Sequence, residues 1–171
     1  MTGIDFVGQS FVNFRHHAFS DAGAHGFRWV DLKTFRFPPA AQSADLLAAV
    51  IAHEQFRDDY AGGGVDPDGS RHGPYWISEV RPDAYRQVGN AEAARVLRDW
   101  AVQHGALPGS LEALLDGGLF AATASATRLY RLRDLGTSAF HDWGGVHGEF
   151  HEFIAIDDRQ SLLTLLVAAD D

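Results

Sequence analysis

Two apolar, strand-forming runs close to the end of the chain give its strongest pattern. Residues 150–156 and 162–168 flank the polar segment 157–161. Two such runs with a short polar connection are typical of a β-hairpin. Earlier in the chain, alternating apolar residues or clusters of strand-forming residues predict four more strands, at 4–14, 27–37, 75–80 and 126–133.

The first two of these strands differ in regularity. Alternation within 27–37 is regular and stops at Pro38-Pro39, which cannot continue a paired strand. The apolar positions of residues 4–14 change parity instead, which predicts a β-bulge.

Helical spacing of apolar residues predicts three helices, over 43–60, 90–104 and 111–115. Gly117 and Gly118 are expected to end the third, because glycine is a poor helix former. Strands and helices do not alternate regularly and the chain closes with a hairpin, which argues against a doubly wound parallel sheet.

The order of elements therefore predicts an α+β fold. We expect a largely antiparallel sheet with about three helices packed on one of its faces, ending in a C-terminal β-hairpin. No repeat or linker divides the sequence, so residues 1–171 are expected to form a single globular domain.

Composition narrows the classes of partner. The formal net charge is −9 with histidine neutral, and lysine and arginine form no long basic run, so we expect no binding of nucleic acid. The sequence has no cysteine, which excludes disulfides, thiolate metal sites and cysteine nucleophiles. It also lacks a signal-peptide pattern and an apolar run of transmembrane length, so a soluble cytoplasmic protein without membrane association is expected.

Candidate chemistry is concentrated where the predicted hairpin begins. His147, Glu149 and His151 occupy every second position, so on a strand their side chains leave one face. Two imidazoles and a carboxylate placed in this way can hold a divalent transition metal, with His141 as a further ligand. Without a metal, the same three groups can act as catalytic acid and base. The competing interpretation is a half-exposed strand whose polar side chains face solvent.

Neighbouring residues could complete a substrate pocket around this triplet. Asp142 and Trp143 follow His141 in a glycine-rich turn, where the indole could form a pocket wall. His16 and His25, in the loop after the first predicted strand, could add ligands or hydrogen-bond acceptors.

Several familiar motifs are incomplete. The segment His53-Glu-Gln-Phe-Arg57 has arginine where a zincin helix needs its second histidine. The turn Asp66-Pro-Asp-Gly69 lacks the first and last ligands of an EF-hand loop. A Walker loop, a dinucleotide glycine fingerprint and a nucleophile elbow are all missing from the sequence.

These observations leave three functions open. The first is a small-ligand or metal-binding domain with its His/carboxylate site on a strand face, which could be an enzyme using acid–base or metal-assisted chemistry on a small molecule. The alternative is an acidic protein-interaction module of the inhibitor or immunity type, without catalytic activity, that binds a basic protein. A homodimer is the third, paired through a free edge of the last strand or of the strand at 27–37.

Overall fold

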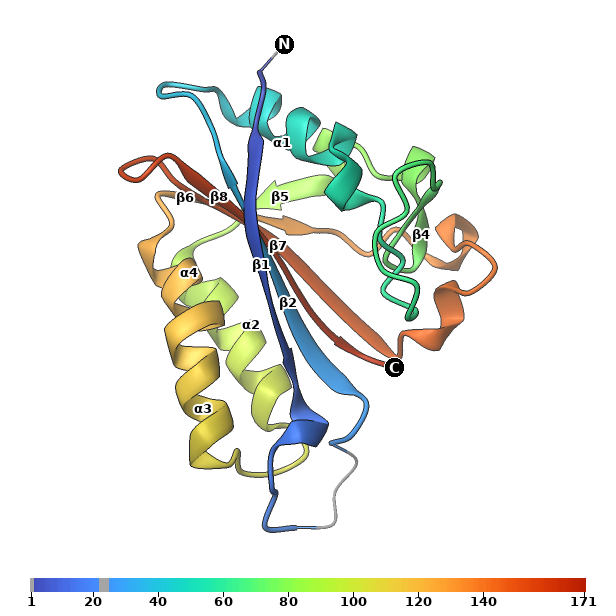
Figure 1. Ribbon diagram of the computed structural model, residues 1–171, viewed down its shortest axis with the longest axis vertical. Coiled ribbons are helices and arrows are strands. Elements are labelled where there is room, and N and C mark those ends of the chain that lie inside the picture. The colour runs from blue at the N-terminus through green and yellow to red at the C-terminus, as the bar shows by residue number, and fades with distance from the viewer. Residues whose placement is uncertain (1, 22–24) are drawn as a thin grey trace.

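A six-stranded antiparallel sheet forms the centre of the computed structural model, which describes residues 2–21 and 25–171 (Figure 1). The strands lie in the order β1-β2-β8-β7-β6-β5, and every neighbouring pair is antiparallel. Their bounds are β1 (Asp5–Asn13), β2 (Arg28–Arg36), β5 (Tyr85–Gln87), β6 (Arg128–Leu132), β7 (Glu149–Asp157) and β8 (Leu162–Asp170). The α+β class, the antiparallel sheet and the C-terminal hairpin β7–β8 are thereby confirmed.

Helices cover both faces of the sheet, so the expectation that they share one face is wrong (Figure 1). α2 (Asn90–Val102) packs on one face together with α3 (Gly109–Leu115) and α4 (Ala121–Ser125). On the opposite face lies α1 (Ser43–Ala52), beside the short two-stranded pair β3 (Arg71–His72) and β4 (Tyr75–Trp76). The central strands therefore bury the side chains of both their odd-numbered and their even-numbered positions, one set on each face of the sheet.

The alternation of β2 divides its side chains between these two cores. Val30 and Leu32 pack against α2 and α3, and Phe35 packs against α1. Trp29, Asp31 and Lys33 have the same parity as Phe35 and therefore lie on the α1 side. Two charged residues are thus buried at positions where a central strand normally carries apolar ones.

Predicted element boundaries needed three corrections. The first helix ends at Ala52 instead of residue 60, because His53 is extended and a 3₁₀ turn follows it. The strand expected at 75–80 is limited to β4 and gives way to a 3₁₀ turn. Gly118 does not end the third helix: a π-helical turn (Asp116–Phe120) continues it into α4. A Cβ at Gly118 would lie 3.1 Å from Leu32 Cδ1, so glycine here allows the helix to approach β2 closely.

The register of the first strand agrees with the sequence pattern. β1 pairs with β2 along its length, and the pairing shifts between Phe6 and Gly8, which is the predicted bulge. β1 and β5 are the outer strands of the sheet, whereas β2 and β8 are interior. A dimer paired through the edge of β2 or β8 is therefore excluded, because both edges of each strand are already hydrogen-bonded.

Within the described part of the chain, no helix combines the length and the apolar character needed to cross a bilayer.

Candidate functional site

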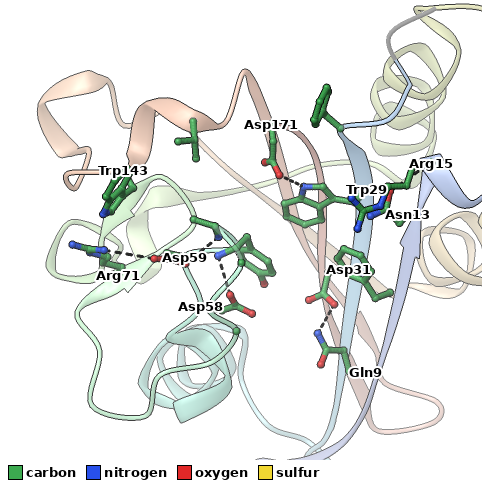
Figure 2. A pocket seen from close by; sticks show the side chains of 18 of the residues that line it. Gln9, Asn13, Arg15, Trp29, Asp31, Asp58, Asp59, Arg71, Trp143 and Asp171 are labelled. Carbon is green, nitrogen blue, oxygen red and sulfur yellow. Dashed lines mark hydrogen bonds and ion pairs between the residues drawn. The ribbon is translucent and has the colours of Figure 1, made fainter. Parts of the chain in front are cut away.

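A cleft of about 790 Å³ opens on the α1 side of the sheet, next to the outer strand β1. β1 and β2 supply one wall, the loop of residues 58–64 faces them, and Trp143 and Val146 add a further wall. Figure 2 shows Trp143 and Arg71 across the cleft from Trp29 and Asp31.

Large apolar side chains surround the opening of this cleft. The exposed fractions of these four residues are 53% for Phe11, 69% for Phe27, 57% for Trp143 and 41% for Val146. Deeper in the cleft, the buried Trp29 indole stacks on Phe11 and on Tyr60, with ring centroids 5.7 and 5.1 Å apart. Exposed apolar side chains gathered around a hollow are typical of a surface that binds another molecule.

Two carboxyl groups and one ammonium group are buried at the base of the cleft. Lys33 Nζ donates hydrogen bonds to Asp58 Oδ2 at 2.8 Å and to the carbonyl oxygen of Gln55 at 2.9 Å. Asp31 Oδ2 lies 3.9 Å from the same Nζ, which is too far for a hydrogen bond. One ammonium group therefore faces two carboxyl groups and is hydrogen-bonded to only one of them.

Asp31 is the incompletely bonded member of this cluster. Its side chain is fully buried, and its Oδ1 accepts one hydrogen bond, from Gln9 Nε2 at 2.6 Å (Figure 2). Among the described residues, neither Asp31 Oδ2 nor the hydroxyl of Tyr60 has a hydrogen-bond partner of standard geometry. Burial raises the pKa of the Asp31 carboxyl, and Asp58 adds to the rise, while Gln9, Lys33 and the nearby Tyr60 hydroxyl act against it. Gln9 is exposed on β1, so the hydrogen bond that Asp31 accepts comes from a side chain at the cleft surface.

A second buried polar cluster lies on the same side of the sheet, outside the lining of the cleft. His72 Nδ1 donates to the carbonyl oxygen of Phe56 at 2.6 Å, and His72 Nε2 lies 2.5 Å from Glu152 Oε2. The Tyr85 hydroxyl donates to Glu152 Oε1. Burial raises the pKa of Tyr85 well above its usual range, and the Glu152 carboxylate reinforces the effect. This cluster uses all its polar side-chain atoms internally.

His147 does not share a strand face with Glu149 and His151, although all three residues line one hollow of about 470 Å³. β7 begins at Glu149, and His147 follows a 3₁₀ turn, so the two-residue repeat of a strand does not extend to it. Its Nδ1 lies 2.8 Å from Asp171 Oδ1 and its Nε2 lies 2.8 Å from the carbonyl oxygen of Asp59. Both contacts are with acceptors, so the ring makes both hydrogen bonds only when it carries two protons. Asp171 also accepts from Trp29 Nε1 at 3.1 Å, so His147 connects the two walls of the cleft through Asp59 and Asp171.

Glu149 and His151 do share a face, on the α2 side of the sheet. His151 Nε2 lies 3.2 Å from Glu149 Oε1, and Gln103, the residue that follows α2, donates to Glu149 Oε2. Burial lowers the pKa of His151, an effect that the neighbouring Arg131 reinforces. Burial would raise the pKa of Glu149, but the hydrogen bonds from Gln103 and His151 outweigh it and lower that pKa.

The remaining predicted residues have different environments. His141 is buried, with its Nε2 donating to the carbonyl oxygen of Gly73 and its Nδ1 accepting from the backbone of Trp143. Asp142 is exposed and lies 3.5 Å from Arg71, a cleft residue, and Trp143 itself lines the cleft.

His16 and His25 do not line the cleft. His16 is exposed in a 3₁₀ turn after β1. His25 is buried, stacks on Phe19 and lies 2.9 Å from Asp21. The predicted loop around it also includes residues 22–24, which lie outside the described residues.

The predicted metal site is not assembled. In residues 2–21 and 25–171, no group of three or more His, Asp or Glu side chains is arranged to hold a metal ion. The physical reason is that both ring nitrogens of His141 and His147 already have hydrogen-bond partners, and that the guanidinium group of Arg131 lies beside His151.

The alternation of residues in β2 contains a signal for the cleft. Asp31 and Lys33 share the parity of Trp29 and Phe35, so two charges fall on the apolar side of the most regularly alternating strand. Charged residues at such positions require internal partners or a ligand. The third member, Asp58, could not be found in this way, because it reaches Lys33 only through the packing of α1 and its following loop.

Comparison with known protein families, with curated proteins and with solved structures found no match. A buried carboxyl below an apolar opening can accept a hydrogen bond from a ligand, and with a raised pKa it can also exchange a proton with one.

Proposed function

We propose that the protein is a small-ligand-binding domain whose cleft takes an organic cation, such as a primary amine attached to an aromatic or other apolar body. The apolar body would contact Phe11, Phe27 and Trp143 at the opening, and the cationic group would pair with Asp31 at the base. The observation that carries the proposal is the buried Asp31 carboxyl beneath an apolar opening, whose one hydrogen bond of standard geometry comes from the exposed Gln9 amide.

A ligand can reach the Asp31 carboxyl only by replacing its present hydrogen-bond donor. The carboxyl has no exposed surface, and the exposed Gln9 amide occupies its Oδ1. A ligand ammonium group would displace this amide and form a charge-assisted hydrogen bond, which is stronger than the neutral one it replaces. Four carboxyl groups line the cleft, against the two guanidinium groups of Arg15 and Arg71, so the local charge favours a cation over an anion.

Three probes that share a phenyl body test the choice of ligand class. We expect 2-phenylethylamine to bind more tightly than 2-phenylethanol, and phenylacetate to bind most weakly, in calorimetric titrations at pH 8. Trp143→Ala should weaken binding of the amine about fivefold through lost aromatic contact. Val102→Ala is the matched control, because Val102 is also an exposed apolar residue but lies on α2, outside the lining of the cleft. Equal binding of the three probes, or tighter binding of phenylacetate, contradicts the proposal.

Protein interaction is a second candidate, favoured by one specific observation. Phe11, Phe27, Trp143 and Val146 are exposed around a cleft that contains carboxylates, and an arginine or lysine side chain of a basic partner has the same chemistry as the proposed ligand. A pull-down at low salt distinguishes the two: a partner that is lost with Trp143→Ala, combined with no binding of the free amine, favours the interaction module.

A further inference from the structure

A second hollow, of about 470 Å³, lies where β7 extends past β6. β6 pairs with β7 from Arg128↔Ile156 to Arg131↔Phe153, so residues 149–152 of β7 have no partner on that side. The hollow is lined from both faces of the sheet, since Glu149 and His151 point to the α2 side and Phe150 to the α1 side.

Three arginines line this hollow in a protein whose net charge is −9. Arg86 and Arg131 are direct cross-strand partners in the β5–β6 pair, and Arg133 follows two residues later on the same segment. Like charges opposite each other on neighbouring strands destabilise a sheet unless an anion lies between or beside them. Arg86 has Glu92 as its partner at 3.0 Å. Neither Arg131 nor Arg133 forms an ion pair with any described residue.

Both carboxyl groups that line the hollow accept hydrogen bonds from groups other than the arginines, Asp134 through Oδ1 alone. Glu149 accepts from Gln103 and from His151. Asp134 accepts from the backbone of Gly136 at 2.8 Å and lies 3.5 Å from the Tyr75 hydroxyl. The guanidinium groups of Arg131 and Arg133 therefore keep free donors: Arg131 contacts His151 Nδ1 at 3.5 Å, and Arg133 uses only its Nε, toward the carbonyl oxygen of Ala84.

We infer that this hollow is an oxyanion site, in which Arg131 and Arg133 bind a carboxylate or phosphate group of a small molecule. Guanidinium groups present several donors in one plane and match the oxygens of either group. His151 lies beside the bound anion and senses its charge, because the ring is hydrogen-bonded to Arg131. This site is separate from the cleft next to β1, and the inference does not depend on the function proposed for that cleft.

Titration with inorganic phosphate and with succinate tests the assignment, in a buffer free of other oxyanions. Saturable binding is expected for at least one of the two anions, accompanied by a shift of the His151 imidazole resonances in NMR spectra. Arg131→Gln and Arg133→Gln should each weaken binding about tenfold, as expected for the loss of charge-assisted hydrogen bonds. Arg95→Gln is the matched control, since Arg95 is exposed on α2 and does not line the hollow.

If Arg131→Gln does not fold, Arg133→Gln still tests the inference, because Arg133 is exposed and contributes no core contact. Tighter binding of phosphate assigns the site to phosphate esters, and tighter binding of succinate assigns it to carboxylates. The inference is overturned if neither anion shows saturable binding, or if Arg133→Gln and Arg95→Gln bind equally well.

Discussion

Two buried polar clusters on the α1 side of the sheet differ in how completely they are hydrogen-bonded. In the His72–Glu152–Tyr85 cluster every polar side-chain atom has a partner, and no member lines the cleft. In the Asp31–Lys33–Asp58 cluster one carboxylate oxygen, Asp31 Oδ2, accepts no hydrogen bond of standard geometry, and it lies at the base of the cleft. When every polar atom of a buried cluster is hydrogen-bonded, the loss of any member leaves its partners unsatisfied and lowers the stability of the fold. A cluster with an unsatisfied atom costs stability unless another molecule binds to that atom. The first cluster therefore has a structural role, and the second is the candidate for ligand recognition.

Removing a member of the saturated cluster should have the largest effect on stability. Glu152→Ala leaves His72 and Tyr85 buried without their shared acceptor, and we expect the free energy of unfolding to fall by about 3–5 kcal/mol. Urea denaturation followed by tryptophan fluorescence measures this change. Glu79→Ala is the control, because Glu79 is exposed, and it should stay within about 0.5 kcal/mol of wild type. If Glu152→Ala lowers the free energy of unfolding no more than Glu79→Ala does, the His72–Glu152–Tyr85 cluster does not have this structural role.

His147 should show an intermediate effect, because it connects the cleft walls. His147→Ala removes hydrogen bonds to Asp171 and to the carbonyl oxygen of Asp59, and we expect a loss of about 2 kcal/mol. Since Asp171 also bonds the Trp29 indole, the emission of that tryptophan should change in the folded state as well. His16→Ala, at an exposed position, should change neither property. Unaltered stability and emission in His147→Ala would show that the two walls are held independently of this ring.

The unsaturated cluster should give the smallest effect, with the opposite sign. The pKa of Asp31 is raised in the folded protein, so the folded state binds its proton more tightly than the unfolded chain. The contribution of Asp31 to stability is therefore greatest below the pKa of an ordinary aspartate and is lost as pH rises through the raised value. Asp31→Asn cannot ionise, and we expect it to be about 1 kcal/mol more stable than wild type at pH 8 and to lack this fall with pH. Thermal unfolding of both proteins from pH 4 to pH 8 measures this difference. An Asp31→Asn variant that is less stable than wild type at pH 8 would show that the buried carboxylate does not destabilise the fold.

Local patterns predicted the longer strands β1, β2, β6, β7 and β8, because alternation depends on neighbouring residues alone, whereas the short strands β3 and β5 were not predicted. The hairpin, the β1 bulge and the course of β2 all follow from positions close in sequence. Gly117 and Gly118 were misleading for the same reason: their weak helix propensity is local, whereas the close contact of Gly118 with Leu32 is set by tertiary packing.

Candidate chemistry was harder to locate from sequence. The alternation of His147, Glu149 and His151 implies a shared face only within one strand, and β7 begins after His147. Trp143 was predicted to form a wall of a pocket around this triplet, and it lines instead the cleft next to β1. Asp31 carried a local signal through its parity with Trp29, but its significance depends on Asp58 and Gln9, which reach it through packing and strand pairing.

Calorimetric titration of 2-phenylethylamine into wild type, Asp31→Asn and Gln9→Ala shows whether Asp31 recognises the ammonium group. We expect opposite effects of the two variants. Asp31→Asn removes the charge that the ammonium group needs and should weaken binding about tenfold or more, while Gln9→Ala removes the amide that competes for Asp31 and should strengthen binding. Unchanged affinity in Asp31→Asn, or equal losses in both variants, would show that the Asp31 carboxyl at the base of the cleft does not recognise the ligand.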